Sequence, residues 1–126
     1  MTSPHGRFAP ARKLADLGAA LALASGFHPS TASTYNMQAV IASACSHTNM
    51  TVEEAITAAT VNASHALLLE AQTGSLQFGK RADLVILHIP DYRELQFVHG
   101  VNLVITTIRN GQILWSRAKT FEPPTS

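Results

Sequence analysis

The sequence has little charge: Asp, Glu, Lys and Arg make up 13% of its 126 residues, against about 25% in an average globular domain. The formal net charge of +1 gives no basis for attracting nucleic acid. With 46% hydrophobic residues, the composition argues against disorder and predicts that some apolar surface meets other protein. No apolar run approaches the roughly 18 residues of a membrane span, so we expect neither nucleic acid nor membrane as a partner.

Cysteine is also scarce, because Cys45 is the only one in the sequence and no internal disulfide can form. We interpret Cys45 as a small buried residue on a helix rather than as a nucleophile. The apolar stretch Leu14–Ala24 follows two basic residues and imitates a secretory signal, but Asp16 interrupts it. We therefore expect a cytoplasmic protein that forms one domain or part of one.

Residues 1–72 are predicted to contain helices and a single short strand. Pro10 fits the first turn of a helix that Gly18 would end with a left-handed cap. Leu21–Ala24 reads as a short buried strand, and a loop follows it. Apolar residues at helical spacing predict a second helix from Met37, with a buried stripe of Val40, Ile41, Ala44 and Cys45.

A third helix is predicted after Thr51, which forms a capping box with Glu54. We expect its inward face to consist of Ile56, Ala59, Ala63, Ala66 and Leu67. We also expect the helices over Met37–Cys45 and Ile56–Leu67 to expose apolar surface that a partner would cover.

Residues 73–118 are predicted to be mainly strands, and residues 119–126 to be a loose tail. Asn110-Gly111 is a strong hairpin signal, and Asp91–Gly100 is an excursion with a short turn or helix. Asp83 can accept hydrogen bonds from turn amides and so fix where the following strand starts. The expected strands are Ser75–Phe78, Leu84–Leu87, Leu103–Ile108 and Gln112–Trp115. The order of elements is typical of the last unit of an alternating α/β barrel followed by a separate β layer.

Two stretches of sequence carry a resemblance to a known family. The letters of Gly74-Ser75-Leu76, Gly79-Lys80 and Ala82–Leu87 resemble the signature of the metal-dependent amidohydrolase superfamily. The stretch from Ala11, followed by Gly26–Ser30 and Met37-Gln38, resembles imidazolonepropionases. The resemblance covers about residues 4–116 and implies the C-terminal portion of a (β/α)8 barrel, over residues 1–72, joined to strands of a small β-sandwich, over residues 73–118.

The resemblance also implies a reaction. Imidazolonepropionases hydrolyse the cyclic amide of 4-imidazolone-5-propanoate to N-formimidoyl-L-glutamate in histidine catabolism, and they use one zinc or iron ion. The metal lowers the pKa of bound water and so generates hydroxide. In the family, an Asp at the end of the last barrel strand and a His-x-His pair on the first strand help to hold this ion.

This sequence departs from the family pattern at both metal-binding motifs. Gly26 stands at the position of the Asp and has no side chain to act as a ligand. No His-x-His pair exists, since the six histidines are isolated at positions 5, 28, 47, 65, 88 and 99. The family's substrate contacts correspond to His28, Ser30 and Thr31, of which only Thr31 is a conservative replacement. We therefore expect no catalytic residue, no metal ligand and no cofactor in this chain.

Three hypotheses follow. The chain is an imidazolonepropionase-like fragment that is inactive alone, whether from a truncated gene or as a natural short subunit. Alternatively, it is a non-catalytic subunit or interaction module that completes its sheet with another chain. As a third possibility, it is a complete small enzyme built around His28. The first two predict as partner either a missing barrel chain or a second copy of this chain, because a lone barrel strand has two unpaired edges.

Overall fold

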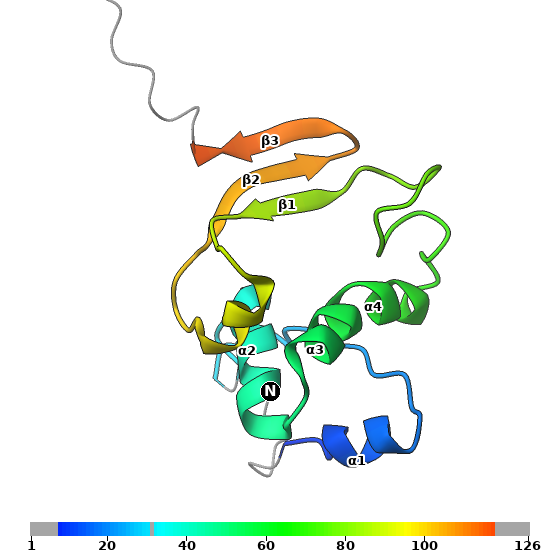
Figure 1. Ribbon diagram of the computed structural model, residues 1–126, viewed down its shortest axis with the longest axis vertical. Coiled ribbons are helices and arrows are strands. Elements are labelled where there is room, and N and C mark those ends of the chain that lie inside the picture. Colours follow the sequence, from blue (N-terminus) through cyan, green and yellow to red (C-terminus); the bar gives the residue numbers. More distant parts are fainter. Residues whose placement is uncertain (1–7, 31, 118–126) are drawn as a thin grey trace, which may run out of the picture.

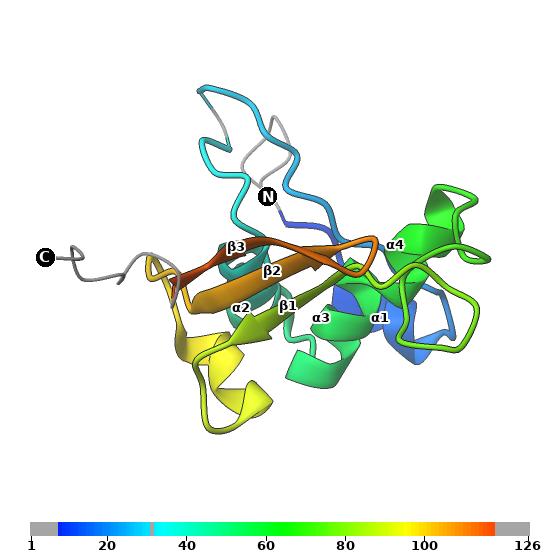
Figure 2. The same cartoon turned by 90° about the horizontal axis from the view of Figure 1, so that it is seen from above.

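A layer of helices and a small antiparallel sheet make up the fold in a computed structural model, which describes residues 8–30 and 32–117 (Figure 1). The helices come first along the chain, and the sheet lies over α2 and α3 when seen from above (Figure 2). The elements in order are α1 (Ala11–Asp16), α2 (Met37–Thr48), α3 (Val52–Ala59), α4 (Val61–Ala66), β1 (Leu84–Leu87), the 3₁₀ helix η1 (Tyr92–Phe97), β2 (Val104–Arg109) and β3 (Gln112–Ser116).

Local capping explains where the predicted helices begin and end. The Asn36 side chain accepts a hydrogen bond from the Gln38 amide at the start of α2, and Asn49 ends that helix with a left-handed φ of 54°. At the start of α3, the capping box is confirmed, because Thr51 and Glu54 satisfy each other's backbone amides. Gly18 has a φ of +81° after α1, as the left-handed cap requires.

The predicted third helix is interrupted, which corrects its expected inward face. Thr60 leaves helical geometry with φ −123° and ψ −83°, so that α3 and α4 are separate. The residues of α3 that the core covers are Val52, Ala55 and Ala58. Ile56 and Ala59 are half-buried, whereas Ala66 and Leu67 lie exposed at the end of α4. The second half of the predicted face, at Ala63, Ala66 and Leu67, therefore takes no part in the core.

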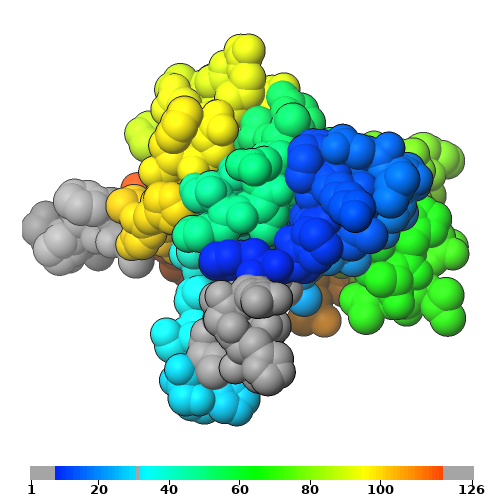
Figure 3. Space-filling view, turned by 90° about the horizontal axis from the view of Figure 1, so that it is seen from below, coloured from blue at the N-terminus to red at the C-terminus, as the bar shows by residue number. Residues whose placement is uncertain are grey.

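The core lies where α2, α3 and η1 meet, and it is built largely from small residues. Its buried members are Ala11, Ile41, Ala44, Met50, Val52, Ala55, Ala58 and Leu95. The space-filling view from below shows α1 and η1 flanking α2 and α3 (Figure 3). Cys45 is half-buried against this core, and desolvation raises the pKa of its thiol. The buried stripe predicted for α2 is therefore correct at Val40, Ile41 and Ala44.

The predicted strand at Leu21–Ala24 does not form. The segment is extended and alternates, with Leu21 and Leu23 half-buried and Ala22 and Ala24 exposed. No strand of the described residues lies beside it, so its backbone finds other partners. The Leu23 amide donates to the Ala58 carbonyl at 2.9 Å, and the Asn62 side chain donates to the Leu21 carbonyl at 2.8 Å. The side chains of the segment alternate as in a strand, but its backbone forms no ladder of hydrogen bonds with a neighbouring strand.

The sheet contains three of the four predicted strands, in the order β1-β2-β3 with antiparallel pairing. Asn110 and Gly111 both have positive φ, 50° and 75°, as a type I′ hairpin turn requires. Asp83 accepts a 2.8 Å hydrogen bond from the Asn110 amide. The expectation that Asp83 binds a turn amide just before its strand is therefore confirmed.

The expected strand Ser75–Phe78 is a turn and loop instead. The segment folds back between Gly74 and Gly79, which have φ of +92° and +87°, and the Phe78 side chain is fully exposed. The continuous apolar run Leu84–Leu87 is typical of a strand buried on both faces, but this prediction is wrong, because Val85 and Ile86 are exposed.

The expectation of exposed apolar surface is wrong for the helix over Met37–Cys45, because η1 packs on that helix. It is confirmed in part for Ile56–Leu67, where Val61 and Leu67 are exposed. Further exposed apolar side chains lie after α4, at Leu68, Leu76 and Phe78, and on the sheet, at Val85, Ile86, Ile113, Leu114 and Trp115. Within residues 8–30 and 32–117, no helix is long and apolar enough to cross a membrane. The predicted tail at 119–126 lies outside the described residues.

Candidate functional site

The loop after the extended segment holds the residues that the resemblance assigns to substrate. It begins near Gly26, whose φ of +57° lies in the left-handed region. The backbones of His28 and Ala32 then bridge through two hydrogen bonds, of 3.0 and 2.9 Å. The described parts of this loop project from the two layers (Figure 2). The structure thus brings His28 and Ser30 together on one exposed turn, while Thr31 lies outside the described residues.

A hydrogen bond joins these two side chains. The Ser30 Oγ lies 3.0 Å from His28 Nδ1, and the Ser30 amide approaches the same nitrogen at 3.4 Å. The direction of the hydrogen bond between the two side chains depends on the tautomer of His28. Both residues are exposed. A Ser–His pair in open solvent lacks the buried base-orienting group and the aimed oxyanion donors of a hydrolytic site, so the arrangement does not support nucleophilic catalysis.

Two aromatic side chains flank this turn. Phe27 and Tyr35 meet edge to face, with ring centroids 5.7 Å apart and planes at 65°. Tyr35 remains 79% exposed, so the pair does not shield the turn from water. Without exclusion of water, electrostatic contacts from His28 stay weak.

The side chains that could act as metal ligands do not fit a zinc or iron centre. Catalytic zinc takes three protein ligands and an open position. Among residues 8–30 and 32–117, no three His, Cys, Asp or Glu side chains lie close enough to hold a metal ion. Gly26, which the resemblance aligns with the family's Asp, has no side chain to act as a ligand. No catalytic step through a metal can therefore be derived from these residues.

Two other described histidines, His47 and His65, lie at helix ends and contact neighbouring side chains. His47 lies in the last turn of α2, where it stacks on Phe8 at a centroid distance of 4.5 Å. His65 lies in the last turn of α4, 4.0 Å from a Glu70 carboxylate oxygen. Both histidines thus lie at a helix C-terminus, where the carbonyl groups carry partial negative charge. His5 lies outside the described residues.

Some long-range contacts that hold the fold were not found from the sequence. Gln38 accepts from the Leu103 amide at 2.9 Å and donates to Asn102, and so ties α2 to the start of β2. Arg12 makes a two-pronged ion pair with Glu54, at 2.8 and 3.0 Å, which joins α1 to the start of α3. Met37-Gln38 was noted as a motif, but its role could not be read without the tertiary contact. Nothing in the sequence pairs residues 12 and 54.

Comparison with known proteins shows which family the chain matches. A model of the amidohydrolase family matches residues 3–114. The chain is 40% identical over 113 residues to the imidazolonepropionase of Geobacillus kaustophilus, covering 90% of this chain and 27% of that protein. It is 42% identical over 106 residues to the imidazolonepropionase of Parabacteroides distasonis, covering 84% and 26%. The chain therefore spans about a quarter of the length of these curated relatives.

Solved structures agree on the fold. An amidohydrolase from Thermotoga maritima superposes with a TM-score of 0.64 at 24% identity, covering 84% of this chain and 25% of the other. A 5-methylcytosine deaminase from Klebsiella pneumoniae superposes with a TM-score of 0.71 at 21% identity, covering 91% and 30%. The family match, the identity to imidazolonepropionases and the shared fold lead to one conclusion: the chain belongs to the amidohydrolase family and corresponds to a portion of an imidazolonepropionase-like member.

Proposed function

We propose that the chain forms the C-terminal, barrel-closing part of an imidazolonepropionase-type amidohydrolase and does not hydrolyse 4-imidazolone-5-propanoate by itself. The supporting observation is the donor set: the region matches imidazolonepropionases at about 40% identity, yet its described residues bring no three metal ligands together. The sequence has no His-x-His, and Gly26 stands at the family's Asp position. What remains is a scaffold with a degraded substrate loop at His28, Ser30 and Thr31.

The proposal is tested by assaying 4-imidazolone-5-propanoate with the purified chain, with and without zinc or iron. The imidazolonepropionase of Geobacillus kaustophilus serves as the positive control. We expect no turnover above the rate without protein. Metal-dependent turnover that disappears in His28→Ala would refute the proposal and support a small enzyme built around His28.

A second experiment tests whether the chain can complete a truncated imidazolonepropionase. The Geobacillus relative is truncated to remove the quarter that this chain matches, and the two pieces are mixed. We expect the mixture to remain inactive with the natural chain and to gain metal-dependent turnover with Gly26→Asp. The left-handed backbone at position 26 accepts Asp better than most residues. Loss of a metal ligand should cost more than the roughly 100-fold lost with an outer-shell partner.

The alternative function is a non-catalytic module that completes its sheet with another chain. The observation in its favour is the sheet itself, because β1 and β3 are both edges in a three-stranded sheet. Neither strand contains a charged residue or a proline that would block further pairing. However, a bulge between Thr107 and Ile108 in the pairing of β2 with β3 twists that edge. Stable co-purification with a partner that is not an amidohydrolase would favour this alternative.

A further inference from the structure

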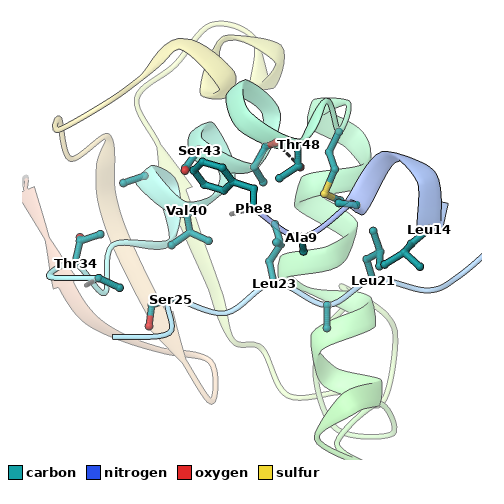
Figure 4. Close-up of a pocket in the computed structure, with 16 residues that line it drawn as sticks. Phe8, Ala9, Leu14, Leu21, Leu23, Ser25, Thr34, Val40, Ser43 and Thr48 are labelled. Atoms are coloured by element: carbon teal, nitrogen blue, oxygen red, sulfur yellow. Dashed lines mark hydrogen bonds between the residues drawn. The ribbon is translucent and has the colours of Figure 1, made fainter. Parts of the chain in front are cut away.

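A cavity lies between α1, the extended segment around Leu21–Ser25 and α2 (Figure 4). Its volume is about 260 Å³. The large side chains that line it are apolar: Phe8, Leu14, Leu21, Leu23, Val40 and Met50. All of these side chains belong to this chain.

The described part of the wall offers a ligand no charged partner. Among residues 8–30 and 32–117, no Asp, Glu, Lys, Arg or His lines the cavity, and the polar side chains there are the hydroxyls of Ser25, Thr34, Ser43 and Thr48. The Thr48 hydroxyl donates to the Ala44 carbonyl at 2.6 Å. Ser43 lies 3.3 Å from His47 Nδ1 on the same helix. These two hydroxyls are already satisfied within α2, so the wall beside Phe8 offers an occupant apolar contact in place of hydrogen bonds.

Its size sets the class of occupant. An apolar cavity of about 150 Å³ holds benzene and stays dry when empty, because a stable internal water needs two to four polar partners. This cavity is larger, and its apolar walls provide few such partners. Pockets that bind small molecules combine mostly apolar walls with a few polar groups, as this one does. The space is therefore large enough for a molecule of two fused rings.

We propose that this cavity is a binding site for an uncharged, largely apolar small molecule of bicyclic aromatic size. It is separate from the turn at His28 and Ser30, neither of which lines it. The ligand would lie between Leu21 and Leu23 on one side and Val40 on the other. Bound there, it would fix the extended segment against α2.

Indole is a suitable probe, and indole-3-acetate of similar ring size but negative charge is its control. Binding to the full chain is measured from the methyl resonances of Leu21, Leu23 and Val40 and from the thermal midpoint. We expect saturable binding of indole, with these methyl shifts following one isotherm, and a rise in midpoint with indole concentration. Indole-3-acetate should bind at least about tenfold more weakly, a difference of about 1.4 kcal/mol.

Filling variants locate the site. Ala44→Leu from α2 and Ala22→Leu from the extended segment each place three extra carbons in the cavity wall. Each should weaken indole binding by about tenfold or more. Ala66→Leu is the matched control, because Ala66 is exposed on α4 and does not line the cavity. It should leave the affinity within about twofold.

Two filling variants from different elements keep the test decisive if one of them fails to fold. The absence of saturable indole binding to the natural chain would overturn the proposal. Equal affinity in the control and in a folded filling variant would also overturn it, since the probe would then bind elsewhere. Neither result bears on the hydrolysis assay, so failure here and failure of the proposed function are distinguishable.

Discussion

Replacing Gly74 by alanine should destabilise the protein by about 2–5 kcal/mol. Gly74 has a φ of +92°, and a Cβ there would overlap Ser64 Oγ, lie 2.6 Å from Ser64 Cβ and lie 3.1 Å from the Thr60 carbonyl oxygen. The left-handed backbone costs a residue with a Cβ about 1–2 kcal/mol. Forcing an extra methyl group against packed atoms costs about 1–3 kcal/mol more. These neighbours belong to α4 and to Thr60 at its start, so the loop cannot relieve the overlap by moving one flexible side chain.

The matched control is Gly79→Ala in the same loop. Gly79 has a φ of +87°, and nothing lies within 4 Å of the position of its missing Cβ. This variant should therefore lose only the backbone cost of about 1–2 kcal/mol. Urea unfolding at neutral pH gives the free energy of unfolding of both variants and of the natural chain. If Gly74→Ala costs no more than Gly79→Ala, the loop does not pack on α4 as described and the steric argument is refuted.

Three further predictions concern acid stability, local order and association. Hydrogen bonds from the Arg12 guanidinium and then from the Thr51 amide hold the pKa of Glu54 below its usual value of 4.5. The stability that Glu54 contributes is therefore present above pH 4.5 and is lost as the pH falls through the lowered pKa. Glu54→Gln should flatten this loss in acid unfolding curves, and an unchanged curve would contradict the ion pair. In amide hydrogen exchange, we expect better protection of the strand segments Val104–Ile108 and Ile113–Trp115 than of Leu21–Ala24, which has no hydrogen-bonded neighbouring strand. Slowest exchange at Leu21–Ala24 would contradict our division of the chain into an unpaired barrel segment and a self-paired sheet. The exposed apolar side chains of the sheet and of the loop before it should bind a hydrophobic dye and promote self-association, and a monodisperse monomer without dye binding in light scattering would count against this.

Local signals in the sequence predicted local structure well. The Thr51–Glu54 capping box, the left-handed Gly18 and the Asn110-Gly111 turn each depend on residues a few positions apart, and each is present in the structure. The acceptor role of Asp83 was also predicted, although its partner at Asn110 was not. These features follow from backbone geometry and hydrogen bonding within one turn, which the sequence specifies directly.

Features that depend on distant or missing neighbours could not be predicted. Leu21–Ala24 has a strand's composition and alternation, but a strand also needs a partner, and none lies beside it among the described residues. Ser75–Phe78 likewise alternates but turns back between two glycines. The break at Thr60 was not predicted, although Thr60, Val61 and Asn62 are weak helix formers. The helical spacing of the alanines on both sides predicted one continuous helix.

The candidate site was predicted in part. The sequence placed His28 and Ser30 in one loop, and the structure joins them by a hydrogen bond of 3.0 Å. Neither this hydrogen bond nor the exposure of the two side chains could be predicted from the sequence. Gly26 and the scattered histidines predicted that no metal site would assemble here, and that expectation still requires a direct measurement of metal binding.

Zinc binding at equilibrium tests the central claim most directly, because the claim is that this chain carries the fold of a metal-dependent family without its metal centre. The natural chain and Gly26→Asp are dialysed against micromolar zinc at neutral pH, and bound metal is measured together with protein. We predict less than one tenth of an equivalent of zinc for both, since one added carboxylate cannot replace three ligands. One tightly bound zinc per natural chain, lost in His28→Ala, would contradict the account.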